Sequence, residues 1–376
     1  MGVSPSRESV LRPGISRWSD SHLSAMMGPH AGDILPLEMK GRRILVTGGA
    51  GFLGSHFVRD ALASGAERVV NFDLLTYAGD RRRLAGLEDD PRYVFVRGDV
   101  ASASDVGAAM REHAPDVVVH YGADTHVTRS ESDPERFFST NVEGTRTMLD
   151  ASITAGVTKF VHISTDEVYG PTLEGAFHEN DKPVGIGGAT SPYAQSKTLG
   201  DDLVLSYAGR LAAVVARPTN AFGPWQFPEK AFPRWIVRAL SGDSLPVWGD
   251  GLYIRQWLFA EDFARAIEIL AERGTPGEAY NVGPTHDPEI TNIDLVRWLL
   301  RYLDLDDDRI KMTAYDRPDH DRRYAVDSSK IAALGWASGD VWKQFGKTVD
   351  WYRANGEWWK SHVAEAESIY SDSKSA

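Results

Sequence analysis

A buried apolar run that leads through a glycine-rich turn into a helix is the feature that most limits how this chain can fold. The run is Ile44–Val46, the turn is Thr47–Gly54 and the helical pattern covers residues 55–64. Glycine allows a tight turn, close approach of the backbone to a ligand and close packing of a helix on a strand. Backbone N–H groups at the start of a helix also favour a phosphate. We therefore expect a strand–turn–helix unit that binds a dinucleotide.

Strand and helix patterns continue to alternate after this unit. Further strands are expected at residues 68–72, 93–96, 117–120, 160–163 and 212–216, with helical connections between most of them. This order predicts an α/β fold, namely a Rossmann-type doubly wound parallel sheet covered by helices on both faces. From about Gly223 the elements are shorter, and Trp and Pro are frequent. A smaller C-terminal α/β part is expected there, over the strand ends where open sheets bind ligands.

The expected organisation has four ranges. Residues 1–40 mix Pro, Gly, Ser and charged residues without a continuous apolar segment, which predicts a flexible N-terminal extension and no secretory signal. Residues 41–222, together with later returning segments, should form the Rossmann domain. Residues 223–360 should form most of the smaller, ligand-binding part. Residues 361–376 should form a C-terminal tail.

Composition argues against several classes of function. Among the 376 residues, 41 Lys and Arg stand against 53 Asp and Glu, a net charge of -12, which disfavours nucleic acid or an anionic membrane surface as a partner. The absence of cysteine excludes disulfides and thiolate sites and is compatible with a cytoplasmic location. No apolar run approaches the ~20 residues of a membrane span. The 11 histidines show no metal-ligand spacing, so no metal is expected, and His126 and His162 should be satisfied polar residues.

Two aspartates follow the second and third expected strands. Asp73 stands 19 residues after Gly54, where a carboxylate can accept both adenosine ribose hydroxyls and repel a 2′-phosphate. NAD is therefore favoured over NADP. The glycines follow GxxGxxG spacing and depart from the GxGxxG fingerprint, so a plain tight turn with a solvated aspartate is the alternative. Asp99 could pair with the adenine amino group or could simply end its strand.

Tyr193 and Lys197 are four residues apart on an expected helix that begins after Ser191-Pro192, so their side chains share a face. A lysine ammonium beside a phenol should lower the pKa of the tyrosine and make it a base for a hydroxyl group. Such pairs also occur on exposed helices without a chemical role. The upstream segment Ser164–Glu167 adds an acid and a base that alcohol oxidation does not need. Together they predict oxidation followed by elimination.

These blocks resemble the dTDP-glucose 4,6-dehydratase family of the extended short-chain dehydrogenase/reductases. The resemblance runs from about Arg42 to Trp359. Its Thr165-Asp166-Glu167 trio is the specific part, because related epimerases and decarboxylases usually carry other residues there. The matching blocks are Thr47–Gly54, Asp73–Gly79, Ser164–Gly170, Tyr193–Lys197, Phe222–Lys230 and Arg317–Tyr324.

The resemblance implies a reaction in three stages on a nucleotide sugar. Tyr193, assisted by Lys197, would take the proton of the sugar C4 hydroxyl while hydride passes to NAD, and Thr165 would hold that hydroxyl. Glu167 would then remove the C5 proton and Asp166 would protonate the departing C6 hydroxyl, before hydride returns to C6. For Asp166 to act as an acid, its pKa must rise well above ~3.9, which burial beside another carboxylate could achieve.

Binding residues and departures also follow from the resemblance. Residues 41–222 would bind NAD and residues 223–360 the nucleotide sugar, with dTDP-glucose expected first and UDP sugars or another hexose after it. Implied NAD contacts are Gly48, Gly51, Phe52, Leu53, Gly54, Asp73, Leu74, Thr76, Asp99, Val100, Tyr121, Ala123, Thr125, Thr140, Tyr193 and Lys197. Implied substrate contacts are Thr125, Thr165, Asn220, Lys230, Pro246, Trp248, Arg255, Asn292, Arg317 and His320. Residues that depart from the family pattern are Leu74, Asp124, Thr125, Thr128, Ala221, Trp248, Tyr253, Gln256 and Asp319.

Other functions remain open on the residues alone. A nucleotide-sugar 4-epimerase or decarboxylase would share the fold, NAD, Tyr193 and Lys197, but would have no evident use for both Asp166 and Glu167. A non-catalytic NAD-binding protein should tolerate loss of Tyr193 or Lys197, yet both are present. The resemblance further implies a homodimer built through helices that begin near Pro134 and Pro192.

Overall fold

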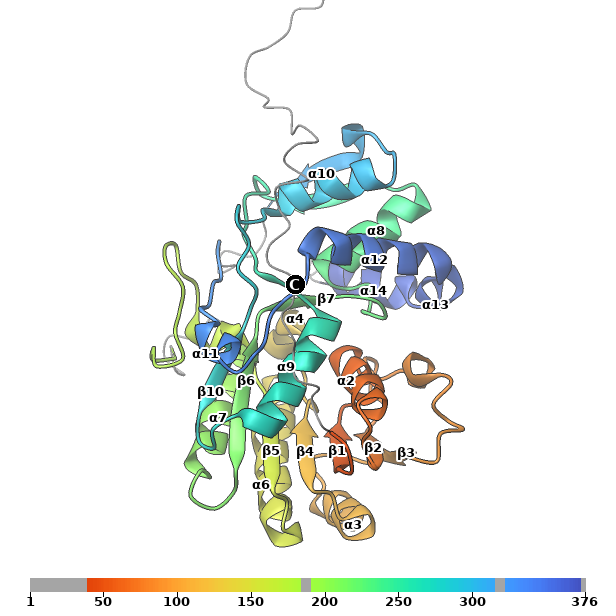
Figure 1. Cartoon of the computed structure of the whole chain (residues 1–376). Helices are drawn as coiled ribbons and strands as arrows, with labels where there is room; N and C mark the ends of the chain where they lie inside the picture. Colours follow the sequence, from red (N-terminus) through yellow and green to blue (C-terminus); the bar gives the residue numbers. More distant parts are fainter. Residues whose placement is uncertain (1–38, 184–190, 315–321, 373–376) are drawn as a thin grey trace, which may run out of the picture. The chain divides into compact units, whose positions relative to one another are not determined.

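A seven-stranded parallel sheet lies at the centre of the structure, a computed structural model that describes residues 39–183, 191–314 and 322–372 (Figure 1). The strands stand in the order β10-β6-β5-β4-β1-β2-β3, and every neighbouring pair is parallel. Winding changes direction between β1 and β4, as in a doubly wound sheet. Both the predicted fold class and the six predicted strands are confirmed. The strands are β1 (Arg43–Thr47), β2 (Arg68–Asp73), β3 (Tyr93–Arg97), β4 (Val117–His120), β5 (Lys159–Ile163), β6 (Ala213–Pro218) and β10 (Ala279–Val282).

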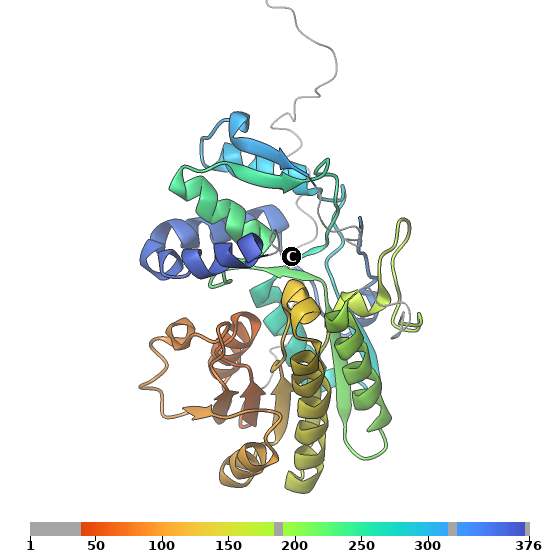
Figure 2. The same cartoon turned by 180° about the vertical axis from the view of Figure 1, so that it is seen from behind.

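Helices cover both faces of this sheet because alternate residues of its strands point to opposite sides. In β1, Ile44 and Val46 pack with α2 and α9, whereas Leu45 packs with α3, α6 and α7 on the other face. Figure 2 shows this second face, with α6 and α7 in front of the sheet. The helix expected at residues 55–64 begins earlier, directly after Gly51. The covering helices are α2 (Phe52–Ala63), α3 (Ala103–His113), α6 (Gly144–Ala155), α7 (Pro192–Ser206) and α9 (Ala260–Arg273).

A second hydrophobic core, rich in aromatic residues, lies in the C-terminal part. Phe222 and Phe345 have ring centroids 4.4 Å apart, and Phe232 and Trp257 pack around them. Two small parallel sheets form here, one from β7 (Asn220–Phe222) and β9 (Trp257–Phe259), the other from β8 (Leu245–Trp248) and β11 (Ile310–Thr313). The helices are α8 (Ala231–Ser241), α10 (Asn292–Tyr302), α12 (Val341–Ala354), α13 (Gly356–Lys360) and α14 (Val363–Asp372), of which α14 falls in the expected tail.

Short elements complete the architecture near the strand ends. The α-helices among them are α4 (Val127–Ser132), α5 (Pro134–Phe138) and α11 (Ser329–Ala332). The 3-10 helices are η1 (Arg81–Leu84), η3 (Asp166–Tyr169) and η4 (Asp307–Arg309), and η2 (Ser139–Glu143) is a π-helix. Within the described ranges, no helix combines the length and apolarity needed to cross a bilayer.

Candidate active site

One cleft of about 1050 Å³ opens where the carboxyl ends of the central strands meet the C-terminal part. All expected site residues of the described ranges line it. From the sheet side they are Gly48, Gly51, Phe52, Leu53, Gly54, Asp73, Leu74, Thr76, Asp99, Val100, Tyr121, Ala123, Thr125, Thr140, Thr165, Asp166, Glu167, Tyr193 and Lys197. From the C-terminal part they are Asn220, Lys230, Pro246, Trp248, Arg255 and Asn292. Arg317 and His320, together with Asp319, lie outside the described residues.

The glycine turn is packed too closely to hold side chains at two of its positions. Gly48 has φ +66°, and a Cβ there would lie 3.0 Å from the backbone N of Gly122. A Cβ on Gly54 would lie 2.3 Å from the carbonyl oxygen of Gly48. This backbone can therefore approach a ligand closely at the start of α2, the geometry that a dinucleotide diphosphate needs.

Asp73 is held against this turn. It is 8% exposed, its Oδ2 accepts a hydrogen bond from Ala50 N at 2.9 Å, and its Oδ1 accepts one from Leu75 N at 2.7 Å. Burial raises the pKa of its carboxyl group. Asp73 is thus a positioned, buried carboxylate at the cleft wall and not a solvated one. Asp99 also lines the cleft, while its Oδ1 accepts a hydrogen bond from Ala101 N at 2.9 Å and so shapes the strand end.

The Thr-Asp-Glu trio forms the first turn of η3, directly beyond β5. Thr165 caps this turn by accepting a hydrogen bond from Glu167 N at 3.3 Å, and Thr165 Oγ1 lies 3.4 Å from Asp166 Oδ1. Asp166 is 4% exposed, and its Oδ2 finds no hydrogen-bond partner among the described residues. Burial, and then the charge of Glu167, raise the pKa of Asp166 to about 7. A carboxyl group in this state can donate a proton near neutral pH.

Tyr193 and Lys197 face the cleft from α7, which begins where Ser191 Oγ accepts a hydrogen bond from Ala194 N. Lys197 is 2% exposed and donates from Nζ to the carbonyl of Ile163 at 2.7 Å. Burial lowers the pKa of Lys197 to about 8.

The expected lowering of the Tyr193 pKa is wrong for this structure. Burial and then the charge of Glu167 raise the pKa of Tyr193, although its hydrogen bond with Thr165 opposes the rise. Lys197 lies on the same face of α7, but it directs its ammonium group to the Ile163 carbonyl. The shared helix face was therefore predicted correctly, whereas its electrostatic effect was not.

Asn141 supports the cleft from behind its wall, and no pattern in the sequence indicates this role. It is 1% exposed and lies in the π-helix η2. Its Oδ1 accepts a hydrogen bond from Asp124 N, and its Nδ2 donates to Asp124 O at 3.0 Å and Ser196 Oγ at 2.9 Å. Asn141 thereby ties the segment after β4 to the helix that carries Tyr193. Since these segments are far apart in the chain, only the tertiary structure reveals the link.

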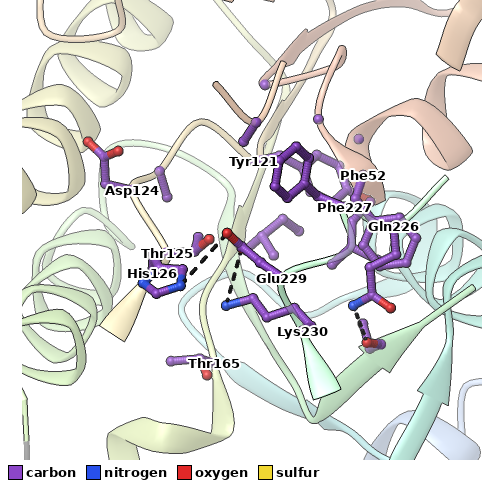
Figure 3. A pocket seen from close by; sticks show the side chains of 18 of the residues that line it. Phe52, Tyr121, Asp124, Thr125, His126, Thr165, Gln226, Phe227, Glu229 and Lys230 are labelled. Atoms are coloured by element: carbon purple, nitrogen blue, oxygen red, sulfur yellow. Dashed lines mark hydrogen bonds and ion pairs between the residues drawn. The ribbon is translucent and has the colours of Figure 1, made fainter. Parts of the chain in front are cut away.

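Buried polar residues also line the cleft near the C-terminal part (Figure 3). Glu229, which is 5% exposed, lies between His126 and Lys230, with Nε2 of His126 and Nζ of Lys230 each 3.7 Å from one of its carboxylate oxygens. Burial raises the pKa of Glu229.

His162 was expected to have hydrogen-bond partners for its ring, and this expectation is wrong. Neither ring nitrogen has a hydrogen-bond partner among the described residues. Burial holds the pKa of His162 well below its usual value.

Several departures from the family pattern have structural roles. Gln256 accepts a hydrogen bond from Val326 N at 2.9 Å and donates to Val326 O at 3.1 Å. Asp124 accepts from Arg136 Nε and Thr140 Oγ1, both at 3.0 Å. Leu74 and Trp248 line the cleft. The carbonyl of Ala221 accepts a hydrogen bond from Gln226, and the guanidinium of Arg322 lies 5.4 Å from the ring of Tyr253.

Six residues of the cleft wall carry a buried polar atom that finds no hydrogen-bond partner within the part of the chain that the structure describes. Because these atoms have almost no exposed surface, a ligand could contact them only after the wall had moved. The groups that fit a dinucleotide directly are the glycine turn and Asp73. No group of three His, Asp or Glu among the described residues could hold a metal ion. The atoms are Tyr121 OH, Ser164 Oγ, Asp166 Oδ2, Thr219 Oγ1, Gln226 Oε1 and Trp257 Nε1.

Known proteins share both the sequence and this fold. The low-salt glycan biosynthesis protein Agl12 of Haloferax volcanii is 43% identical over 295 residues, which cover 78% of this chain and 92% of Agl12. A dTDP-glucose 4,6-dehydratase of Streptomyces antibioticus is 42% identical over 327 residues, covering 84% of this chain and 94% of the relative. The crystal structure of the dTDP-glucose 4,6-dehydratase DesIV of Streptomyces venezuelae, with NAD bound, has a TM-score of 0.80 at 39% identity and covers 85% and 99% of the two chains.

The NAD dependent epimerase/dehydratase family matches residues 44–283, which include the glycine turn, the Thr-Asp-Glu trio and the Tyr193–Lys197 pair. With the similarity to named dehydratases over most of the chain, this match confirms the resemblance noted from the sequence. The chain belongs to the NAD dependent epimerase/dehydratase family and, within it, to the dTDP-glucose 4,6-dehydratases.

Proposed function

We propose that this chain is an NAD-dependent hydro-lyase that converts dTDP-glucose to dTDP-4-keto-6-deoxyglucose. The observation that carries the proposal is the place of Asp166. Its buried carboxyl group lies next to Glu167, in the cleft that Tyr193 and Lys197 also line, and this burial raises its pKa to about 7. Dehydration needs such an acid and an adjacent base, in addition to the groups that serve alcohol oxidation.

Three residues would serve the oxidation at C4. Thr165 would hold the C4 hydroxyl, and Tyr193 would take its proton, although burial raises the pKa of Tyr193 in this structure and so disfavours the phenolate that this role needs. Lys197, fixed by the Ile163 carbonyl, would place a positive charge on the cofactor side of α7. NAD, held along the glycine turn and Asp73, would supply the acceptor for the C4 hydride and, once reduced, the donor of a hydride.

Asp166 and Glu167 would carry out the elimination. A 4-keto group makes the C5 proton acidic, and Glu167 would remove that proton. Asp166 would give its proton to the C6 hydroxyl, which leaves as water. The two adjacent carboxyl groups are suited to opposite roles because burial and the charge of Glu167 keep Asp166 partly protonated near neutral pH.

The C-terminal part would bind the nucleotide. Lys230 and Arg255 would face the diphosphate and base region, Pro246 and Trp248 would pack against the base, and Asn220 and Asn292 would bind polar groups of the ligand. We place dTDP-glucose first among the substrates because of the family to which the chain belongs. UDP sugars and other hexoses remain alternatives because several residues here depart from the family pattern.

A 4-epimerase or decarboxylase is less well supported. It would use the same fold, cofactor, Tyr193 and Lys197, but it would have no role for a protonated Asp166 beside Glu167. The named dehydratases at about 40% identity favour the same conclusion.

The direct test is incubation of the purified protein with dTDP-glucose and UDP-glucose separately, without added NAD. Mass spectrometry and NMR would follow the sugar nucleotides, after the bound NAD has been quantified. Loss of one water with a new C6 methyl group and a C4 ketone is the expected result. No change in either sugar nucleotide, with NAD confirmed on the protein, would refute this substrate choice. An inverted C4 or loss of CO₂ from another substrate would refute the dehydratase.

We also propose that the protein is a cytoplasmic homodimer. The lack of cysteine supports a reducing compartment. The helices that begin at Pro134 and Pro192 pack against each other within the chain, and their remaining surface would meet a second copy. Light scattering after size-exclusion chromatography tests the dimer, and fractionation of the source cells tests the location.

A further inference from the structure

Arg83 is a buried cation in the wall of the cleft that takes no part in the proposed reaction. It lies in η1, between β2 and β3, with a relative exposure of 1%. None of the ion pairs described in residues 39–183, 191–314 and 322–372 includes it. A buried charge without a carboxylate in direct contact is costly, so its retention needs a reason.

The guanidinium of Arg83 contacts four segments, and three of them are far from it in the chain. Nη1 donates to the carbonyl of Ala50 in the glycine turn at 2.8 Å and to the carbonyl of Ala78 in the loop after β2 at 2.5 Å. Nε donates to the carbonyl of Trp225, between β7 and α8, at 3.0 Å. The guanidinium also lies 5.6 Å from the ring of Trp358 in α13.

These contacts connect the two sides of the cleft. Ala50 also donates its N–H to Asp73, so Arg83 supports the same turn that positions the buried aspartate. Trp225 directly precedes the segment that carries Gln226, Glu229 and Lys230 into the cleft. Movement of the glycine turn away from the substrate side would therefore break hydrogen bonds of a single side chain.

The charge of Arg83 lies in the wall of the cleft. Burial lowers its pKa to about 10, which leaves the guanidinium protonated at neutral pH. Its bonds to carbonyl oxygens orient this charge, and the charges of Asp80 and Asp73 offset part of it without a direct contact. A dinucleotide diphosphate on the glycine turn would lie next to the segment that Arg83 holds.

We propose that Arg83 is a positioning residue that retains the dinucleotide, by tying the glycine turn to the Trp225 segment and by placing a positive charge behind the turn. The inference rests on the proposed function, in which reduced cofactor must stay bound until its hydride returns to the sugar. Loss of NADH between the two hydride transfers would leave an enzyme that cannot finish its turnover.

The test compares Arg83→Gln and Arg83→Lys with Arg81→Gln. Arg81 lies in the same 3-10 helix, η1, but is exposed, with its guanidinium 4.7 Å from the Phe95 ring, so it is the matched control. We expect Arg83→Gln to raise the dissociation constants of NAD and NADH at least tenfold, by calorimetry, and to lower the NAD that copurifies with the protein. Arg83→Lys should also weaken both, because a single ammonium nitrogen cannot occupy the positions of both Nη1 and Nε, from which Arg83 donates to the Ala50 and Trp225 carbonyls. Arg81→Gln should match the wild type.

Unchanged affinity for NAD and NADH in a folded Arg83→Gln variant would overturn the proposal, whatever its effect on thermal stability. If that variant does not fold, amide hydrogen exchange on the wild type tests whether Arg83 ties the two segments together. Added NAD should then protect residues 48–54 and 225–230 together, and protection confined to residues 48–54 would refute the tether. The calorimetric measurement of NAD and NADH binding does not depend on turnover of the sugar nucleotide. A wild type that binds NAD but does not dehydrate the sugar would therefore refute the proposed reaction and leave the binding role of Arg83 measurable.

Discussion

Replacement of Asp166 by Asn should separate oxidation from elimination. The carboxyl group has a pKa of about 7 in the folded protein, so about half of it is protonated at pH 7, whereas at the ordinary value of 3.8 only about one molecule in 1,600 would be. The structure thus raises the population of the acid roughly 800-fold at this pH. Asparagine keeps the shape of the side chain but removes the proton that the C6 hydroxyl needs.

The expected loss in kcat is about 10²–10⁴-fold, the usual contribution of a positioned general acid. Because oxidation does not use Asp166, NADH should accumulate on the variant. Stopped-flow absorbance of NADH after mixing with dTDP-glucose measures this, and quenched samples show whether the keto sugar still has its C6 hydroxyl.

The pH dependence provides a second measure of the same residue. The protonated carboxyl group is the active form, and its pKa is raised, so elimination should be constant well below pH 7 and fall about tenfold per pH unit well above it. The Asn variant should lack this fall. Asp60→Asn is the control, since burial also raises the pKa of Asp60 but this residue does not line the cleft. A kcat within threefold of the wild type, with no added NADH signal, would show that Asp166 is not the acid.

Three further changes test other parts of the structure. Tyr193→Phe should leave NAD bound but unreduced after mixing with substrate, and NADH formation at the wild-type rate would contradict the role of this base. Gly54→Ala should lower the NAD content of the purified protein, because its Cβ would lie 2.3 Å from the Gly48 carbonyl oxygen; Gly209→Ala, with nothing within 4 Å of its Cβ, should retain NAD, and equal NAD content in both would refute the argument. Asp201→Ala breaks a buried ion pair in which Asp201 Oδ2 accepts from Arg217 Nε at 2.8 Å, so urea unfolding should show a loss of about 3–5 kcal/mol that the exposed neighbour Asp202→Ala does not show. A loss of less than ~1 kcal/mol in the free energy of unfolding would show that this ion pair does not stabilise the fold as its burial indicates.

Local patterns in the sequence were enough to predict much of the fold and many of the residues in the cleft. A strand buried on both faces of a sheet is a continuous apolar run, so six strands of the sheet could be located from the order of the residues alone. The spacing of Gly48, Gly51 and Gly54 reports a backbone geometry that only small residues permit. The separation of Tyr193 and Lys197 reports the pitch of one helix. Each of these signals depends on neighbours within a few residues, and the three glycines, Tyr193 and Lys197 line the cleft.

The sequence by itself therefore determined six of the seven strands, the order of the elements along the chain and the residue types of the cleft, whereas the state of those residues was decided by tertiary structure. The pKa of Tyr193 is raised and not lowered, because burial and Glu167 outweigh a lysine that bonds elsewhere. The contacts of Asn141 and Arg83 form only where segments distant in the chain meet. Burial and charge are sums over all neighbours in space, and spacing along a chain does not contain them.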